Sequence, residues 1–178
     1  MSKYKNHRVG VFVDVSNMYH SAKNLFGARI NFREVLREVT GERQLIRAIA
    51  YGVTSSSNEE QAFFDALDKS GFEVKSKELQ IFAGGAKKAD WDVGLAVDAI
   101  TLADRLDTIV IVSGDGDYIP LVQYLQNNKG CMVEVAAFGK TTSSKLIEVV
   151  DDYLDLASDP KRFLIRKRFV KKAAAKAS

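Results

Sequence analysis

The stretch that most constrains the fold is Ile-Val-Ile-Val at residues 109–112, which runs into Ser-Gly-Asp-Gly-Asp. Four β-branched residues in a row are typical of a strand that is buried on both faces in a parallel sheet. The next residues are too polar and too rich in glycine to continue the strand. Asp115 and Asp117 therefore follow directly after a central strand. Ligands of open α/β sheets bind at that end of the strands.

Two interpretations of this stretch remain open at the level of the sequence. Glycine on either side of Asp115 removes side-chain bulk, which would let a ligand or an ion approach the backbone closely. The alternative is a turn that leads into a helix, with Asp117 as the N-cap and Pro120 in the first turn. The residues alone favour neither interpretation.

Strand and helix patterns alternate five times along the chain. The expected strands are 8–13, 45–53, 72–82, 109–112 and 132–138, and the expected helices are 16–26, 31–39, 58–70, 90–105, 118–128 and 145–157. Ser16 is expected to cap the first helix, and the helix over 90–105 is apolar on most sides, so we expect it to be well buried. The alternation predicts a three-layer α/β fold: a parallel sheet of about five strands in the order 3-2-1-4-5, with helices on both faces. The first and fourth strands then flank the crevice.

Composition excludes several classes of protein. Cys131 is the only cysteine of the 178 residues, so no internal disulfide forms. With His7 and His20 it cannot build a usual zinc site. The chain shows neither the apolar core of a signal peptide nor a membrane-spanning run, so we expect a cytoplasmic protein with no membrane partner. A homodimer stays open.

Charge is distributed unevenly. Residues 161–178 hold eight lysines and arginines and no acid, so the net charge of +3 hides a charge of −5 on the rest of the chain. With Pro160 at the border, we expect a domain over residues 1–158 and a basic tail over 159–178. Basic tails contact nucleic acid in many proteins, and a solvated, disordered end is the alternative.

Several acids converge on one edge of the predicted sheet. Asp14 ends the first strand and Asp115 ends the fourth, and neighbouring strands lie about 5 Å apart. Asp92 opens the helix before the fourth strand, and Asp98 interrupts an apolar run in that helix. Two carboxylates 4 Å apart repel by about 4 kcal/mol at an effective dielectric near 20. Neutralisation by Mg²⁺ or Mn²⁺ suits all-oxygen ligands, and such an ion supports phosphodiester hydrolysis.

Each acid also has a structural alternative. Asp14 would serve as a helix cap, and Asp92 would interact favourably with the positive end of its helix dipole. Asp98 would form an ion pair with Lys23 or Arg105.

Other side chains near this edge are candidates for contacting a substrate. Asn17 would orient water or a phosphate, or only stabilise the turn. Trp91 and Tyr118 would stack on a base, and packing in the core or at the rim is the alternative for Trp91. The candidate substrate-binding residues are Ser16, Ser113, Lys87, Lys88 and Tyr118. For the lysines, a solvated loop is the alternative.

Residues 12–17 (Phe-Val-Asp-Val-Ser-Asn), 88–98 and 113–118 resemble the three signatures of NYN domains of the LabA-like group, in the PIN-like nuclease superfamily. The resemblance covers about residues 8–157. It implies a PIN-like Rossmannoid fold, metal-dependent ribonuclease activity and RNA as the partner. The residues that it implicates are Asp14, Asp92 and Asp115 as the metal-binding set, with Asn17, Asp98 and Asp117 in support.

The sequence thus predicts a Mg²⁺- or Mn²⁺-dependent endoribonuclease, with Asn17 and the three metal-binding acids as its catalytic residues. The alternative is a non-catalytic RNA-binding or regulatory module, in which the basic tail supplies most of the affinity. A phosphatase of the haloacid-dehalogenase type is disfavoured, because Ser16 stands where its second aspartate would be.

Overall fold

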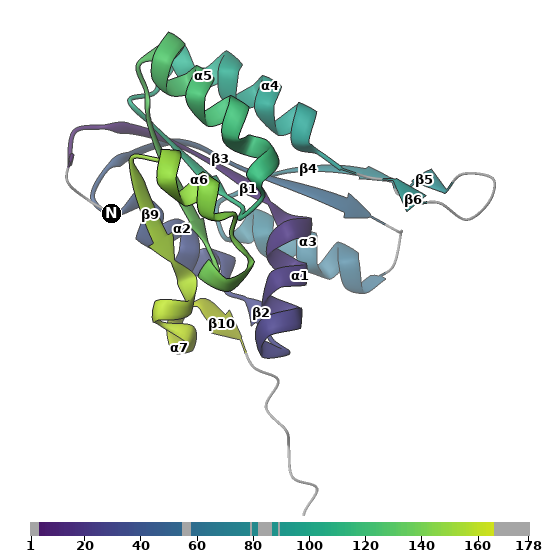
Figure 1. The fold of residues 1–178 in the computed structure, drawn as a ribbon. Coiled ribbons are helices and arrows are strands. Elements are labelled where there is room, and N and C mark those ends of the chain that lie inside the picture. The colour runs from purple at the N-terminus through teal and green to yellow at the C-terminus, as the bar shows by residue number, and fades with distance from the viewer. Residues whose placement is uncertain (1–3, 55–57, 79, 82–86, 89, 166–178) are drawn as a thin grey trace, which may run out of the picture.

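The computed structural model describes residues 4–54, 58–78, 80–81, 87–88 and 90–165. Within these residues, a central sheet of six parallel strands is covered by α4 and α5 on one face and by α1, α2 and α3 on the other (Figure 1). The sheet strands are β1 (Arg8–Asp14), β3 (Gln44–Thr54), β4 (Glu73–Glu78), β7 (Thr108–Val112), β8 (Met132–Ala137) and β9 (Asp152–Asp155). The helices are α1 (Val15–Phe26), α2 (Phe32–Thr40), α3 (Asn58–Lys69), α4 (Asp92–Leu102), α5 (Ile119–Lys129), α6 (Ser144–Val149) and α7 (Pro160–Phe163). Two small antiparallel pairs join β2 (Arg29–Ile30) to β10 (Leu164–Ile165) and β5 (Gln80–Ile81) to β6 (Lys87–Lys88).

The predicted fold class and strand order are confirmed. The sheet runs β4-β3-β1-β7-β8-β9, which is the expected order with one strand added at the β8 edge. Every residue of β7 is fully buried, because helices cover both faces of the sheet. The central strands therefore lie in the middle of the hydrophobic core. Because they are parallel, their carboxyl ends lie at the same edge of the sheet.

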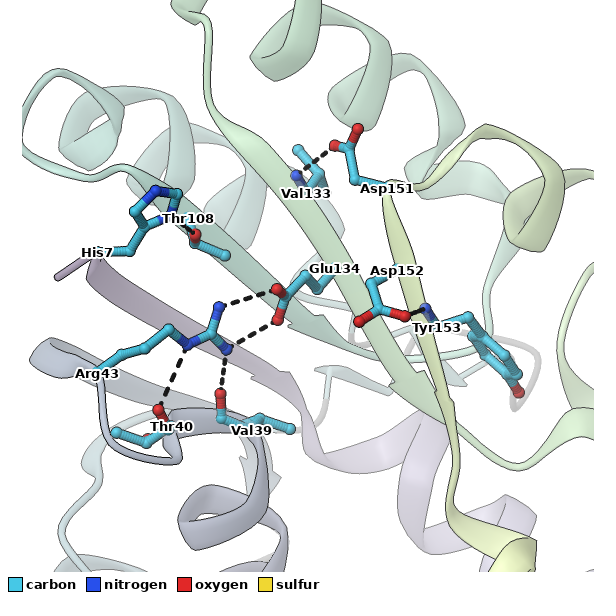
Figure 2. A network of polar contacts seen from close by, with 10 residues as sticks. All are labelled: His7, Val39, Thr40, Arg43, Thr108, Val133, Glu134, Asp151, Asp152 and Tyr153. Atoms are coloured by element: carbon cyan, nitrogen blue, oxygen red, sulfur yellow. Dashed lines mark hydrogen bonds and ion pairs between the residues drawn. The ribbon is translucent and has the colours of Figure 1, made fainter. Parts of the chain in front are cut away.

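The predicted helix over 145–157 is wrong in its second half. Helix α6 ends at Val149, and the chain then forms β9 along the open edge of β8. The carboxylate of Asp151 accepts the backbone N–H of Val133 at 2.8 Å, which holds the new strand against the sheet (Figure 2). Val150, the first residue after α6, is β-branched and has an extended backbone, which ends the helix there.

Two helix caps differ from the prediction. The N-cap of α1 is Asp14, whose carboxylate accepts the Asn17 N–H at 3.0 Å, so Ser16 lies inside the helix and does not cap it. Asp117 does not act as a cap either. The Asp115 carboxylate accepts the Asp117 N–H at 3.0 Å and starts the short 3-10 turn Gly116–Tyr118 before α5.

Helix α4 is shorter and more exposed than expected. It spans Asp92–Leu102 and continues as the 3-10 turn Ala103–Arg105. Leu95 and Ala99 are buried, whereas Val93 is 75% exposed. The prediction of a well-buried helix is wrong, because α4 lies in an outer layer and contacts the sheet along one side only.

The predicted domain boundary after residue 158 falls within packed structure. Phe163 is 2% exposed in the core, and β10 pairs with β2. Arg162 binds Glu34 of α2 at 3.1 Å. Residues 159–165 therefore belong to the domain, and the remainder of the basic tail, 166–178, lies outside the described residues. No helix in the described part of the chain is long and apolar enough to cross a membrane.

Candidate acidic metal site

The site lies at the carboxyl ends of the two central strands. Strands β1 and β7 pair in parallel with Val13 opposite Val112, so the next residues, Asp14 at the end of β1 and Ser113 just after β7, follow side by side. This juxtaposition is the one that the strand order predicted. It places the end of β1 next to the Gly-Asp-Gly-Asp loop.

Side chains from both strand ends hold this loop in place. The Ser113 hydroxyl accepts the Asp115 N–H at 3.2 Å and donates to Asp14 Oδ2 at 3.4 Å. Asn17 Oδ1 accepts the Gly114 N–H at 3.1 Å. Ser113 is fully buried, and its role in binding a substrate stays a prediction. Its hydroxyl fixes the position of Asp115 relative to Asp14.

The two glycines of the loop are required by a second segment that closes on it. A Cβ at Gly114 would lie 3.0 Å from the Thr141 carbonyl oxygen, and one at Gly116 would lie 3.0 Å from Ser143 Oγ. The Ser143 N–H donates to the Gly114 carbonyl at 2.9 Å. Because Gly114 and Gly116 have no side chains, residues 141–143 can pack closely against the loop that carries Asp115 and Asp117.

Three carboxylates come together at the mouth of the site, and we call them the acidic cluster: Asp92, Asp115 and Asp117. One carboxylate oxygen from each lies within 4.8 Å of the others. Asp92 arrives from the start of α4, and the other two come from the loop after β7. Asp14 lies outside this tight group and is connected to it through hydroxyl groups. The structure therefore draws Asp117 closer to the centre of the site than the resemblance implied.

Tyr118 connects Asp14 to the acidic cluster. Its hydroxyl donates to Asp92 Oδ1 at 2.9 Å and lies 3.4 Å from Asp14 Oδ2. The residue is 2% exposed, so its ring is packed in the core, and its role in binding a substrate stays a prediction. Burial, followed by the charges of Asp14 and Asp92, raises the pKa of Tyr118. The phenol therefore stays protonated and acts as a donor to the carboxylates.

The electrostatics of the site favour a cation. Burial raises the pKa of Asp14, and the charges of Asp92 and Asp115 raise it further, whereas the hydrogen bond from the Asn17 N–H lowers it. The pKa of Asp92 is raised by burial first, and then by Asp115 and Asp117 among its neighbours. Carboxylates that resist ionisation because they crowd one another are stabilised as anions by a bound positive charge.

Asp98 lies in a different environment. It accepts hydrogen bonds from Lys75 Nζ at 2.6 Å and from the Tyr51 hydroxyl at 2.7 Å. Burial acts to raise the pKa of Asp98, but these two donors outweigh it and lower the pKa. Asp98 forms an ion pair, as expected, but its partner is Lys75 and not Lys23 or Arg105. With its charge matched by Lys75, Asp98 is not brought into the acidic cluster.

The remaining candidates come from α1 and β6. Asn17 and Ser16 are half-buried in the first turn of α1, and the carbonyl side of the Asn17 amide faces Gly114. The backbone of Lys87 and Lys88 forms β6. A role for Ser16 or either lysine in binding a substrate stays a prediction.

The sequence reasoning missed the segment 141–143, which closes on the loop. Thr141 binds the Ser21 hydroxyl of α1 at 3.0 Å, and the backbone of Ser143 binds Gly114. A signal for it was present, since Thr-Thr-Ser-Ser follows the predicted strand 132–138 at the same edge of the sheet.

The donor set suits a hard divalent cation. The described residues offer carboxylate oxygens from the acidic cluster, with Asp14 beside it and no histidine or thiol in the group. Mg²⁺ and Mn²⁺ prefer such oxygen ligands. The arrangement fits an ion that several acids share.

Comparisons with known proteins agree with this architecture. The chain is 26% identical over 161 residues to the low amplitude and bright protein LabA of Synechococcus elongatus, covering 86% of each chain. It is similar in structure to the protein of unknown function VPA0982 from Vibrio parahaemolyticus, with a TM-score of 0.83 and 30% identity over 93% of this chain and all of that one. A weaker likeness, with a TM-score of 0.45 and 15% identity, is to the T5 D15 protein co-crystallised with metal ions, over 79% of this chain and 59% of that one. The NYN domain model matches residues 8–157, and the chain belongs to the NYN domain family.

Proposed function

We propose that this protein is a metal-dependent endoribonuclease that hydrolyses phosphodiester bonds of RNA at the acidic cluster. The observation that carries the proposal is the meeting of the Asp92, Asp115 and Asp117 carboxylates within 4.8 Å, next to a half-buried Asp14 whose pKa is raised. A group of carboxylates without a cationic partner, at the carboxyl ends of parallel strands, is more typical of a catalytic site than of a structural one.

The acidic cluster and Asp14 would hold Mg²⁺ or Mn²⁺. When bound, such an ion lowers the pKa of a water molecule and neutralises the charge of a phosphate. Tyr118 keeps its proton and orients the Asp92 carboxylate, so it serves as a positioning residue. Because Asn17 Oδ1 accepts the Gly114 N–H, the NH₂ side of its amide faces away from that loop and is suited to donate to a phosphate oxygen.

Charges outside the acidic cluster would supply attraction for the RNA backbone. The cluster itself repels a polyanion, so binding depends on the ion and on basic side chains. We assign this attraction to Lys87, Lys88 and the basic residues of 166–178. In this proposal RNA is the partner, the protein acts in the cytoplasm, and whether it works as a homodimer is left to measurement.

The test is cleavage of a labelled single-stranded RNA with Mg²⁺ or Mn²⁺, with EDTA as the metal-free reference. Wild type should cut internally, and Asp115→Asn should lose at least about a hundredfold in rate, because removing even outer partners of a metal ligand costs 10–100-fold. Asp152→Asn, at the β9 edge, is the matched control and should cut as wild type does.

Equal cleavage by wild type and Asp115→Asn would reject the assigned site. Tight RNA binding by wild type without any cleavage, under every metal tried, would replace the nuclease with the non-catalytic RNA-binding module.

A further inference from the structure

Two lysines extend from β4 on the face of the sheet that carries Tyr51. Strand β4 pairs with β3 so that Lys75 lies opposite Tyr51 and Lys77 lies opposite Val53. Because side chains alternate along a strand, the two lysines point to the same side of the sheet. Strand β3 separates β4 from β1, whose last residue is Asp14. The lysines therefore stand two strands away from the acidic site, at the same edge.

The two lysines differ in what neutralises their charge. The ammonium group of Lys75 lies 2.6 Å from the Asp98 carboxylate. The ammonium group of Lys77 lies over the Trp91 ring, 4.8 Å from its centroid, and among the described residues it forms no ion pair with a carboxylate. A ring quadrupole orients a cation without neutralising it. Lys77 thus presents a positive charge that is available to an anion.

The ring that holds Lys77 is itself rigidly placed beside the acidic cluster. The Trp91 Nε1–H donates to the Gly52 carbonyl of β3 at 2.7 Å, and the ring packs on Tyr51 at 5.5 Å between centroids. A Cβ at Gly94 would lie 2.6 Å from this ring, so the glycine makes room for it. Trp91 directly precedes Asp92, so the indole and a cluster carboxylate are fixed together at the start of α4.

We propose that Lys77 is a substrate-binding residue that contacts a phosphate of the nucleic-acid strand next to the one held at the acidic cluster. This proposal rests on the proposed function. In this arrangement the nucleic-acid strand extends from the acidic cluster across Trp91 towards β4. A lysine ammonium binds phosphate as a point charge, and the indole restricts its motion beforehand, which reduces the ordering cost on binding.

A purely structural role would have a different signature. An exposed cation–π contact stabilises a fold by about 0.5–1 kcal/mol and does not change the affinity for RNA. A phosphate contact changes the affinity and its salt dependence, with a loss of about 0.7 in the slope of log K against log salt for a single strand.

The experiment is fluorescence anisotropy with a labelled single-stranded RNA of about 12 nucleotides. Binding is measured with Mg²⁺ in the Asp115→Asn background, so that the RNA stays intact. Lys77→Gln should weaken the affinity about tenfold, which corresponds to about 1.4 kcal/mol, and should lower the salt slope, because one charged contact with phosphate is lost. Lys77→Arg should restore binding. Lys69→Gln, an exposed lysine in the last turn of α3, is the control and should bind as the parent does.

An unchanged affinity in Lys77→Gln, a loss no greater than that of Lys69→Gln, or no RNA binding by the parent would overturn the proposal. Weaker binding in Lys77→Gln together with a wild type that does not cut RNA would support the Lys77 contact and reject the nuclease. The failures of the two proposals are thus distinguishable.

Discussion

Charged side chains lie near both ends of the central sheet, and they are paired with opposite charges at one end only. Near the end where the strands begin, Arg43 is clamped to Glu134 of β8 by two hydrogen bonds of 2.8 Å, and it also donates to the carbonyl groups of Val39 and Thr40 (Figure 2). Both charged side chains are almost fully buried. At the opposite end, Asp14 and the acidic cluster crowd together, and their main hydrogen-bond donors are hydroxyl and backbone groups.

The contrast separates a structural role from a functional one. The Arg43–Glu134 pair joins the loop after α2 to β8 and satisfies both charges within the fold. At the carboxyl ends, the pKa values of Asp14 and Asp92 are raised by burial first and then by neighbouring carboxylates. The paired charges have a structural role. The unpaired acids raise the free energy of the folded state, and binding of a cation would lower it.

The largest expected effect concerns the matched pair. Glu134→Ala leaves Arg43 buried without its partner and should lower the free energy of unfolding by about 3–5 kcal/mol. Urea denaturation measures this loss. The double variant Arg43→Met, Glu134→Leu should recover most of it, because the buried charge is gone. A single variant as stable as wild type would show that the pair is not structural.

A smaller effect is expected from Tyr118→Phe, which keeps the buried ring and removes the hydroxyl that orients Asp92. Partners of this kind change metal affinity by about 10–100-fold. We expect Mn²⁺ affinity, measured by titration calorimetry, to fall within that range while the thermal midpoint changes little. Tyr153→Phe, which removes a hydroxyl near Thr142, is the control. Equal Mn²⁺ affinity in Tyr118→Phe and wild type would remove Tyr118 from the site.

The smallest effect is a gain in stability. The pKa of Asp14 is raised in the fold, so its ionisation destabilises the folded state as pH rises from the ordinary value of 3.8 through the folded value. Asp14→Asn keeps a good N-cap and removes this penalty, so without metal its Tm should be a few degrees higher at pH 7. The gain should disappear below pH 3.8. A lower Tm at pH 7 would mean that the acids are balanced after all.

Much of the fold followed from local patterns. The β-branched run at 109–112 predicted the buried centre of the sheet, and alternation of strands and helices predicted its order. The edge strand β9 was missed because its four residues lie behind a helical pattern and gain their partners only from β8. The partner of Asp98 was also missed, since Lys75 is 23 residues away and reaches it through the pairing of β3 with β4.

The sequence predicted which acids belong to the site, but it did not predict how their side chains contact one another. Strand order predicted that Asp14 and the loop of Asp115 would be neighbours, because residues at the carboxyl ends of adjacent parallel strands must meet. It did not predict that Tyr118 would turn inwards or that Asp117 would join Asp92. Those outcomes depend on contacts between remote segments, since the Tyr118 hydroxyl meets Asp92 of α4 and Asp14 of β1.

The sequence alone determined the layers, the central strands and the edge at which the acids gather, because periodicity and glycine placement act locally. Only the tertiary structure decided which charges are paired. Asp98 forms a salt bridge with Lys75, and Glu134 forms one with Arg43. Among the described residues, the acidic cluster has no cationic partner. Charge balance depends on distances between segments that are remote along the chain, and those distances exist only after the helices have packed onto the sheet.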